Sequence, residues 1–224
     1  MFEDEVVIKL NGKGCWLLAN YSRNMVSTYT TKQLVNDDFE IKVNCKVDWQ
    51  KIIKSGVHYT GVVCFNGAHF GILCKYYNGY AMISAEVWSE HEGENIVNEA
   101  QVLIRDDKLK EDDWRDIRLI YKKNESITIV TTEGRETTEI QGEILDYSGS
   151  YLWVGCCDNH KHTPKEFQGD WYGEIRTISV EGKERCFADY DFDKKTRYKC
   201  YDNSGNGNHL IAKHLNEKGF IIIY

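Results

Sequence analysis

Asp202, Asn206 and Asn208 lie in a run of polar and glycine residues, Tyr201–Leu210, whose side-chain oxygens could bind calcium. Calcium takes roughly six to eight oxygen ligands, and this run offers a single carboxylate. The same residue types also build turns, because Gly accepts positive φ and the side chains of Asp and Asn bond to nearby backbone. The composition therefore favours a turn, and calcium at these three residues stays as the alternative.

A second group of metal-binding residue types is the segment Cys156–His162, which holds two adjacent cysteines and two histidines. Structural zinc sites usually separate their cysteines by roughly two to four residues, so that both turn toward one ion. Adjacent residues at the end of a strand point to opposite faces. The pattern therefore favours one buried cysteine, one exposed cysteine and a polar loop over a zinc site.

Paired carboxylates could support glycoside hydrolysis, and Glu86, Glu90 and Glu92 would share one face if a single strand carried all three. Retaining hydrolysis needs two carboxyl groups about 5–5.5 Å apart. However, 90–94 has the composition of a solvated loop. The chain also lacks a Gly-x-Ser-x-Gly motif, a phosphate-binding loop and a dinucleotide fingerprint. We therefore predict no catalytic residues.

Aromatic side chains offer another kind of site, because their flat faces can stack on sugar rings. The chain has six Trp, fourteen Tyr and eight Phe, although packing in the core is the commoner use of any one ring. Trp16, Trp114 and Trp153 stand in apolar strand contexts and are predicted to lie in the core. The predicted carbohydrate-binding residues are Trp88, Trp171, Tyr77 and Tyr80.

Strands are expected to position most of these residues. Phe39, Ile41, Val43, Cys45 and Val47 alternate with polar residues, which is typical of a strand with one buried face. Turn signals such as Asn-Gly separate the further strands. These are predicted over 59–65, 70–77, 81–88, 114–122, 126–132, 136–140, 151–156, 171–180 and 220–224.

Helical patterns are weak in this sequence. Residues 47–55 could form a turn or two, and 107–113 has the composition of a charged loop. Many short strands with turns between them predict an all-β sandwich of two antiparallel sheets. Because no linker, repeat or low-complexity tract interrupts the chain, we predict one domain over residues 1–224.

Several segments, taken in order, resemble the concanavalin A-like lectin/glucanase superfamily, and especially its laminin-G-like and pentraxin-like members. The first is Asp38–Val43, similar to an early strand of such domains. The second is Asp113–Tyr121, similar to a Trp-x-x-Ile-x-Leu-x-Tyr strand. The third joins Leu152–Gly155 to Phe167–Ile175, where Gly-flanked apolar residues resemble the family's ending. This resemblance implies a jelly-roll fold.

A fourth segment, Asp202–His209, is similar to an Asp-x-Ser-Gly-Asn-Gly-Asn-His stretch of bacterial and viral laminin-G-like domains. In those domains the stretch usually lies near the N-terminal edge, whereas here it lies near the C-terminus. The departure implies a permuted strand order, or a terminal strand that packs beside the first one. Ligand positions of the family are therefore not carried over to this chain.

The resemblance implies a binding domain without fixing its ligand, since the same fold serves lectins, adhesion modules, glycosidases and structural modules. We expect a non-catalytic, lectin-like carbohydrate-binding domain that is an accessory module of a larger protein or assembly. The alternatives are a structural or protein–protein interaction module and, second, a glycoside hydrolase or lyase. The expected partner is a glycan or polysaccharide, with another protein as the alternative.

The net charge of −7 and the pI near 5.5 argue against nucleic acid and anionic membranes as partners, because both attract basic surfaces. No window approaches the ~18 apolar residues of a membrane span, and the acidic N-terminus has no signal-peptide core. The location is unknown from the sequence, with the cytoplasm as the default. In that setting most of the eight cysteines are expected to be free and buried.

Overall fold

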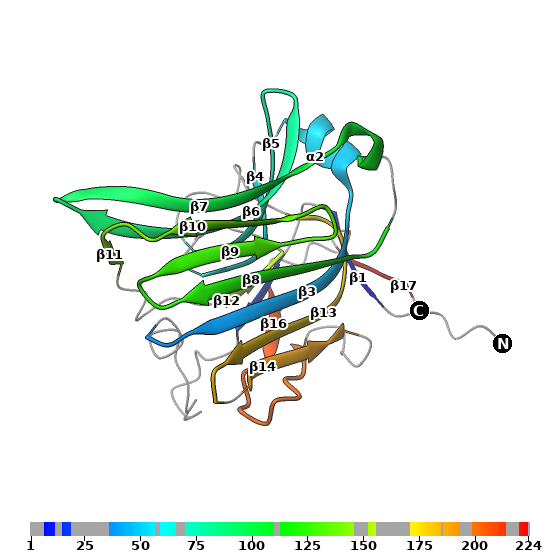
Figure 1. Cartoon of the computed structure of the whole chain (residues 1–224). Helices are drawn as coiled ribbons and strands as arrows, with labels where there is room; N and C mark the ends of the chain where they lie inside the picture. The colour runs from blue at the N-terminus through cyan, green and yellow to red at the C-terminus, as the bar shows by residue number, and fades with distance from the viewer. Residues whose placement is uncertain are drawn as a thin grey trace.

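The computed structural model describes residues 7–11, 15–18, 36–56, 59–65, 70–109, 113–145, 152–155, 171–184, 186–192, 199–213 and 220–223. Their strands form two antiparallel sheets, which we call sheet A and sheet B (Figure 1). Buried side chains fill the space between them.

Sheet A crosses the front of the view in Figure 1. Its order is β10 (Arg135–Glu139), β9 (Ser126–Val130), β8 (Arg115–Lys122), β3 (Phe39–Val47), β13 (Tyr172–Gly182), β1 (Val7–Asn11) and β17 (Phe220–Ile223), and β14 (Cys186–Asp191) also pairs with β13.

Sheet B packs behind sheet A. Its order is β11 (Glu143–Ile144), β6 (Tyr80–His91), β5 (Phe70–Tyr77), β4 (Tyr59–Phe65), β12 (Leu152–Val154), β2 (Cys15–Leu18), β16 (Leu210–Lys213) and β15 (Lys199–Cys200), and β7 (Glu94–Ile104) pairs with β6.

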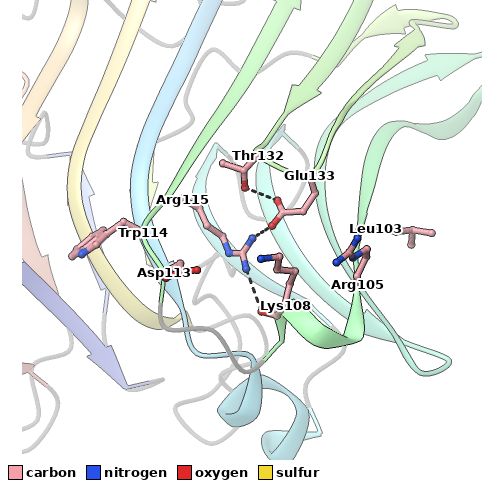
Figure 2. Close-up of a pocket in the computed structure, with 8 residues that line it drawn as sticks. All are labelled: Leu103, Arg105, Lys108, Asp113, Trp114, Arg115, Thr132 and Glu133. Carbon is pink, nitrogen blue, oxygen red and sulfur yellow. Dashed lines mark hydrogen bonds and ion pairs between the residues drawn. The ribbon is translucent and has the colours of Figure 1, made fainter.

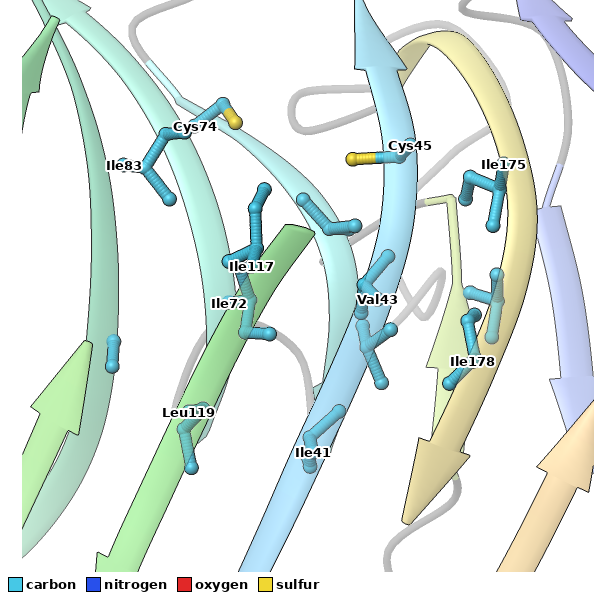
Figure 3. Close-up of a cluster of buried hydrophobic side chains, with 14 of the residues drawn as sticks. Ile41, Val43, Cys45, Ile72, Cys74, Ile83, Ile117, Leu119, Ile175 and Ile178 are labelled. Atoms are coloured by element: carbon cyan, nitrogen blue, oxygen red, sulfur yellow. The ribbon is translucent and has the colours of Figure 1, made fainter. Parts of the chain in front are cut away.

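The strand β3 lies in the middle of sheet A and shows how the sequence pattern builds the sandwich. Its residues alternate strictly between buried and half-buried positions, as the period-two pattern predicts. In Figure 3, Cys45 of β3 points toward Cys74 of β5 in the other sheet, and Ile41 and Ile72 belong to the same buried cluster. Burial of each large apolar side chain stabilises the fold by about 1.5–3 kcal/mol.

One short helix, α2 (Trp49–Ser55), follows β3, where the sequence predicts a turn or two. The side chain of Asp48 accepts a hydrogen bond from the backbone N–H of Lys51 (3.0 Å), which is a typical helix N-cap. Gly56 ends the helix in the left-handed conformation, with φ of 71°. The buried side chains of Trp49 and Ile52 anchor α2 to the core.

The strand β7 was not predicted from the sequence, and it corrects the expectation of a loop over 90–94. The chain stays extended in β6 to His91, turns at Glu92 and Gly93, and returns along the whole length of β6. The apolar alternation of β7 is obscured because Asn98 takes an inward position while Val97 and Leu103 face outward and are exposed.

The predicted all-β jelly-roll sandwich with little helix is confirmed. The prediction of one domain over 1–224 stays a prediction. No helix in the described part of the chain is long and apolar enough to cross a membrane. The five cysteines whose side chains are described are thiols outside any disulfide, and four of them are buried.

Candidate functional site

Tyr77 and Tyr80 form an exposed pair at one end of sheet B. They face each other across the β5–β6 hairpin, which turns at Asn78 and Gly79. Gly79 has a φ of 85°, which favours glycine at this position of the turn. The side chains of Tyr77 and Tyr80 are 57% and 61% exposed. We call this pair the tyrosine rim, and it brings two of the four predicted carbohydrate-binding residues together on the surface.

A pocket of about 570 Å³ opens at the same end of the molecule. Ala81 of β6 pairs with Ile104 of β7, so Tyr80 and Arg105, the next residues beyond that pair, lie at the same edge. Figure 1 shows the β5–β6 turn and α2 at this end. The residues that line the pocket, drawn in Figure 2, are Leu103, Arg105, Lys108, Asp113, Trp114, Arg115, Thr132 and Glu133. We call it the Arg115 pocket.

An ion pair between Arg115 and Glu133 is the most deeply buried part of the Arg115 pocket. Arg115 opens β8 at an inward position, in the same row as Ile117 and Leu119, and is only 3% exposed. Its Nη1 forms an ion pair with Oε1 of Glu133, and its Nη2 donates to the backbone oxygen of Lys108 at 3.3 Å. A charge so deeply placed needs such a partner.

The turn between β9 and β10 fixes the position of Glu133. The hydroxyl of Thr132 donates to Oε2 of Glu133 at 3.0 Å, and the backbone N–H of Glu133 donates to the hydroxyl of Thr131 at 3.1 Å. The backbone N–H of Thr131 donates to the carbonyl of Gly134 at 2.8 Å. Local bonds therefore hold the carboxylate toward Arg115.

Trp114 forms part of the pocket wall and corrects the prediction that it lies in the core. It is only partly buried, and Arg176 lies over its ring with the guanidinium carbon 4.0 Å from the ring centroid. Nζ of Lys46 lies 5.3 Å from the same centroid. Cations over an indole face contribute about 0.5–1 kcal/mol at exposed sites, so this ring is held in place at the surface.

Both hydrogen-bond donors and hydrogen-bond acceptors line the Arg115 pocket. Arg105, Lys108 and Arg115 donate, whereas Asp113 and Glu133 accept. Outside the lining, Asp107 forms a two-bond ion pair with Arg105, and the guanidinium lowers the pKa of the Asp107 carboxyl. A ligand entering the pocket therefore meets both kinds of hydrogen-bonding group beside an aromatic ring.

The two predicted tryptophans do not join this site. The prediction for Trp171 is wrong: the residue is fully buried in the core, its backbone N–H donates to the carbonyl of Gly155, and its ring offers no face to a ligand. Trp88 is partly buried on β6. It lies eight residues from Tyr80 along one strand, roughly 26 Å at 3.3 Å per residue.

Two carboxylates do lie side by side on sheet B, although they differ from the predicted set. Glu86 pairs in register with Glu99, and Lys75 forms ion pairs with both, the bond to Glu99 being 2.9 Å long. Glu86 is 5% exposed, and burial raises the pKa of its carboxyl despite the nearby Lys75. Because one ammonium holds both carboxylates, the cluster fits a structural role better than glycoside hydrolysis.

The carboxylate of Asp202 is used inside the protein. It is 8% exposed. Its Oδ1 accepts the backbone N–H groups of Asp189 (3.0 Å) and Ser204 (2.9 Å), and its Oδ2 accepts that of Asn208 (2.9 Å). Three backbone donors thereby find an acceptor, which is the Asx-type turn that the sequence favours.

The two asparagines of this segment, which we call the Asp202 loop (202–208), also bond to the protein. Nδ2 of Asn206 donates to the carbonyls of Cys186 (2.7 Å) and Phe187 (3.0 Å), and Nδ2 of Asn208 donates to that of Phe187 (2.8 Å). These bonds tie the loop to β14. Calcium at these residues stays a prediction.

The described residues include no group of three or more His, Cys, Asp or Glu placed to hold a metal ion. The segment Cys156–His162, weighed above as a zinc site, lies outside the described residues.

The chain matches no family model and no curated protein. Among solved structures it is similar to domains LG4–5 of the mouse laminin α1 chain, with 12% identity, a TM-score of 0.55, and coverage of 85% of this chain and 45% of that one. It is also similar to a heptameric SAP-like pentraxin of Limulus polyphemus, with 11% identity, a TM-score of 0.49, and coverage of 80% and 77%.

An alginate lyase of Pseudomonas aeruginosa is a third match, with 11% identity, a TM-score of 0.39, and coverage of 69% and 68%. At 12% identity the likeness to the laminin domains shows the fold alone. The chain therefore has a laminin-G-like β-sandwich fold, and it spans less than half of the laminin fragment.

Proposed function

We propose that this chain is a non-catalytic, lectin-like module that binds carbohydrate through the tyrosine rim and the Arg115 pocket. The observation that carries the proposal is the position of an exposed pair of tyrosines beside a pocket that offers both donors and acceptors. Such a module would serve as an accessory domain of a larger protein or assembly.

Sugar chemistry fits both parts of this site. The C–H faces of a pyranose ring are apolar and can stack on the rings of Tyr77 and Tyr80, which otherwise expose apolar surface to water. The hydroxyls of the same sugar both donate and accept. They can therefore bond to the guanidinium groups and to the carboxylates of the Arg115 pocket.

A protein partner is the second candidate, because tyrosine and arginine are enriched in the energetically dominant residues of protein interfaces. Tyr77, Tyr80 and Arg105 at one end of the sandwich would suit such an interface. A glycoside hydrolase or lyase is less well supported, because Glu86 is buried and ion-paired. Nucleic acid is not expected as a partner for a chain with a net charge of −7.

The experiment is a glycan array probed with the wild-type protein and with a Tyr77→Ala/Tyr80→Ala variant. We expect selective binding by the wild type and a loss of at least roughly tenfold in affinity for the variant, which is typical of interface tyrosines. The matched control is Tyr201→Ala. Tyr201 is also exposed, at 45%, but it lies beside the Asp202 loop.

If the Tyr77→Ala/Tyr80→Ala variant still binds the glycan, the carbohydrate site lies elsewhere on the molecule. No selective binding by the wild type would reject the carbohydrate proposal. Cross-linking through a photoreactive residue at position 80 would then test the protein-partner candidate.

A further inference from the structure

The guanidinium of Arg115 has more N–H donors than its described partners use. It carries five N–H groups. In the described part of the chain, one bonds to Glu133 and another to the carbonyl of Lys108. The remaining donors have no acceptor among the described residues, although Arg115 is only 3% exposed and lines a pocket of about 570 Å³. An acceptor supplied by a ligand would satisfy them.

Glu133 has acceptor capacity in the same place. A carboxylate offers about four lone-pair directions. Arg115 uses one at Oε1 and the hydroxyl of Thr132 uses one at Oε2. Since Glu133 also lines the pocket, unused donors and unused acceptors lie next to each other there.

The charges of the Arg115 pocket favour a neutral ligand. Arg115 is already paired with Glu133, and Arg105 with Asp107, while Lys108 and Asp113 add one charge of each sign to the lining, so the pocket has no excess positive charge to attract an anion. An anionic ligand would have to approach these carboxylates in a chain whose net charge is −7. A neutral hydroxyl can accept from the guanidinium and donate to the carboxylate without adding charge.

We propose that Arg115 and Glu133 form a donor–acceptor pair that recognises two neighbouring hydroxyls of a neutral sugar. This inference rests on the proposed function and names the class of ligand and the residues that select it. Arg115 donates to one hydroxyl oxygen and Glu133 accepts the proton of the next. The pair is preorganised, because the turn holds Glu133 and the carbonyl of Lys108 holds Arg115.

The test is calorimetric titration of the wild-type protein with two groups of oligosaccharides. Neutral trisaccharides of glucose, galactose, mannose and xylose form the first group, and trigalacturonate and a sulfated chondroitin oligosaccharide form the second. We expect binding of a neutral trisaccharide whose affinity changes less than about twofold between about 50 and 500 mM NaCl, because salt screens only charge–charge attraction.

The double variant Arg115→Met/Glu133→Leu removes donor and acceptor together and leaves no buried unpaired charge. We expect it to fold and to lose at least about tenfold in affinity for the neutral ligand. Thr132→Val, at an exposed position, removes one bond that orients Glu133 and should lower the affinity by a smaller factor. The matched control replaces another ion pair, Lys42 and Glu181 at 2.7 Å on sheet A, by Met and Leu.

The outcomes separate the two proposals. Loss of neutral-ligand binding in the Arg115/Glu133 variant, with binding kept in the Lys42/Glu181 control, supports the inference. Binding only of the uronate or the sulfated glycan, with steep salt dependence, overturns it and leaves the carbohydrate proposal standing. Wild-type affinity in a folded Arg115/Glu133 variant and in Thr132→Val also overturns the inference and leaves the carbohydrate proposal standing. No binding of any glycan overturns the proposed function itself.

Discussion

The Asp202 loop and the tyrosine rim differ in where their polar atoms find partners. In the loop, both carboxylate oxygens of Asp202 and the amide groups of Asn206 and Asn208 bond to the protein's own backbone. At the rim, Tyr77 and Tyr80 expose more than half of their surface beside a pocket with unused donors.

Residue type alone therefore does not identify a binding site in this molecule. Asp and Asn suit calcium, and they equally suit a turn whose backbone N–H groups need acceptors. A polar cluster that satisfies itself stabilises the fold. A cluster that leaves apolar rings and hydrogen-bonding groups facing solvent is available to a ligand. By this criterion the rim is the candidate carbohydrate site, whereas the bonds of the loop stabilise the fold and calcium there stays a prediction.

The largest effect that would test the comparison is expected for Asp202→Ala. The substitution leaves three buried or half-buried backbone donors without their acceptor, so we expect the free energy of unfolding to fall by roughly 2–4 kcal/mol. Denaturant titration measures this loss. Asp37→Ala, at an exposed position, is the control and should stay within about 0.5 kcal/mol. An equally small loss for Asp202→Ala would contradict the structural role.

Tyr80→Ala should show the opposite pattern. Because the Tyr80 side chain is 61% exposed, its removal should change the free energy of unfolding by no more than about 0.5 kcal/mol. The same variant should weaken glycan binding. A large loss of stability, measured by the same titration, would mean that the Tyr80 side chain packs against other side chains of the protein and is not available to a ligand.

A smaller effect concerns pH and Asp189, which donates its N–H to Asp202. Burial raises the pKa of the Asp189 carboxyl above its usual 3.8, and the negative charges of Asp202 and Asp191 raise it further. The folded protein therefore holds this proton to a higher pH than the unfolded chain, and its contribution to stability is lost as the pH rises from 3.8 through the raised pKa.

The substitution Asp189→Asn removes this pH-dependent loss of stability, because asparagine does not ionise. The free energy of unfolding of the variant, relative to the wild type, should increase as the pH rises from below 3.8 to neutral. Denaturant titrations at several pH values measure the difference. A difference in the free energy of unfolding that stays constant with pH would show that the pKa of the Asp189 carboxyl is not raised in the folded protein.

The smallest effect is expected from removing calcium. If the Asp202 loop is complete as a hydrogen-bonded turn, a chelator should shift the unfolding midpoint by less than about 1 °C, because only an ion that binds the folded state stabilises it. A rise of several degrees on adding calcium, abolished by Asp202→Asn, would restore the calcium hypothesis for Asp202, Asn206 and Asn208.

Local patterns predicted much of the sandwich. The alternation of β3, the β4–β5 and β5–β6 hairpins and the sequence of β8 are all found in the structure. The strand β7 was missed because its inward row includes Asn98, which bonds across to Ser89 and to the N–H of Gln141. A polar residue that is satisfied by distant partners breaks the apolar pattern without breaking the strand.

The site was only partly predictable. The Asn-Gly turn indicated that Tyr77 and Tyr80 would flank a hairpin, but burial of Trp171 depends on packing between segments far apart in the chain. Arg115 was not predicted, because arginine is rarely buried in proteins. Its spacing of two from Ile117 was the available signal that it points inward.

The most direct measurement is an NMR titration of the isotope-labelled protein with the strongest ligand from the glycan array. We expect the amide signals of residues 76–81, 103–109 and 131–135 to shift on binding, and those of 200–209 to stay unchanged. Shifts confined to 200–209, with the tyrosine rim and the Arg115 pocket unchanged, would contradict this expectation.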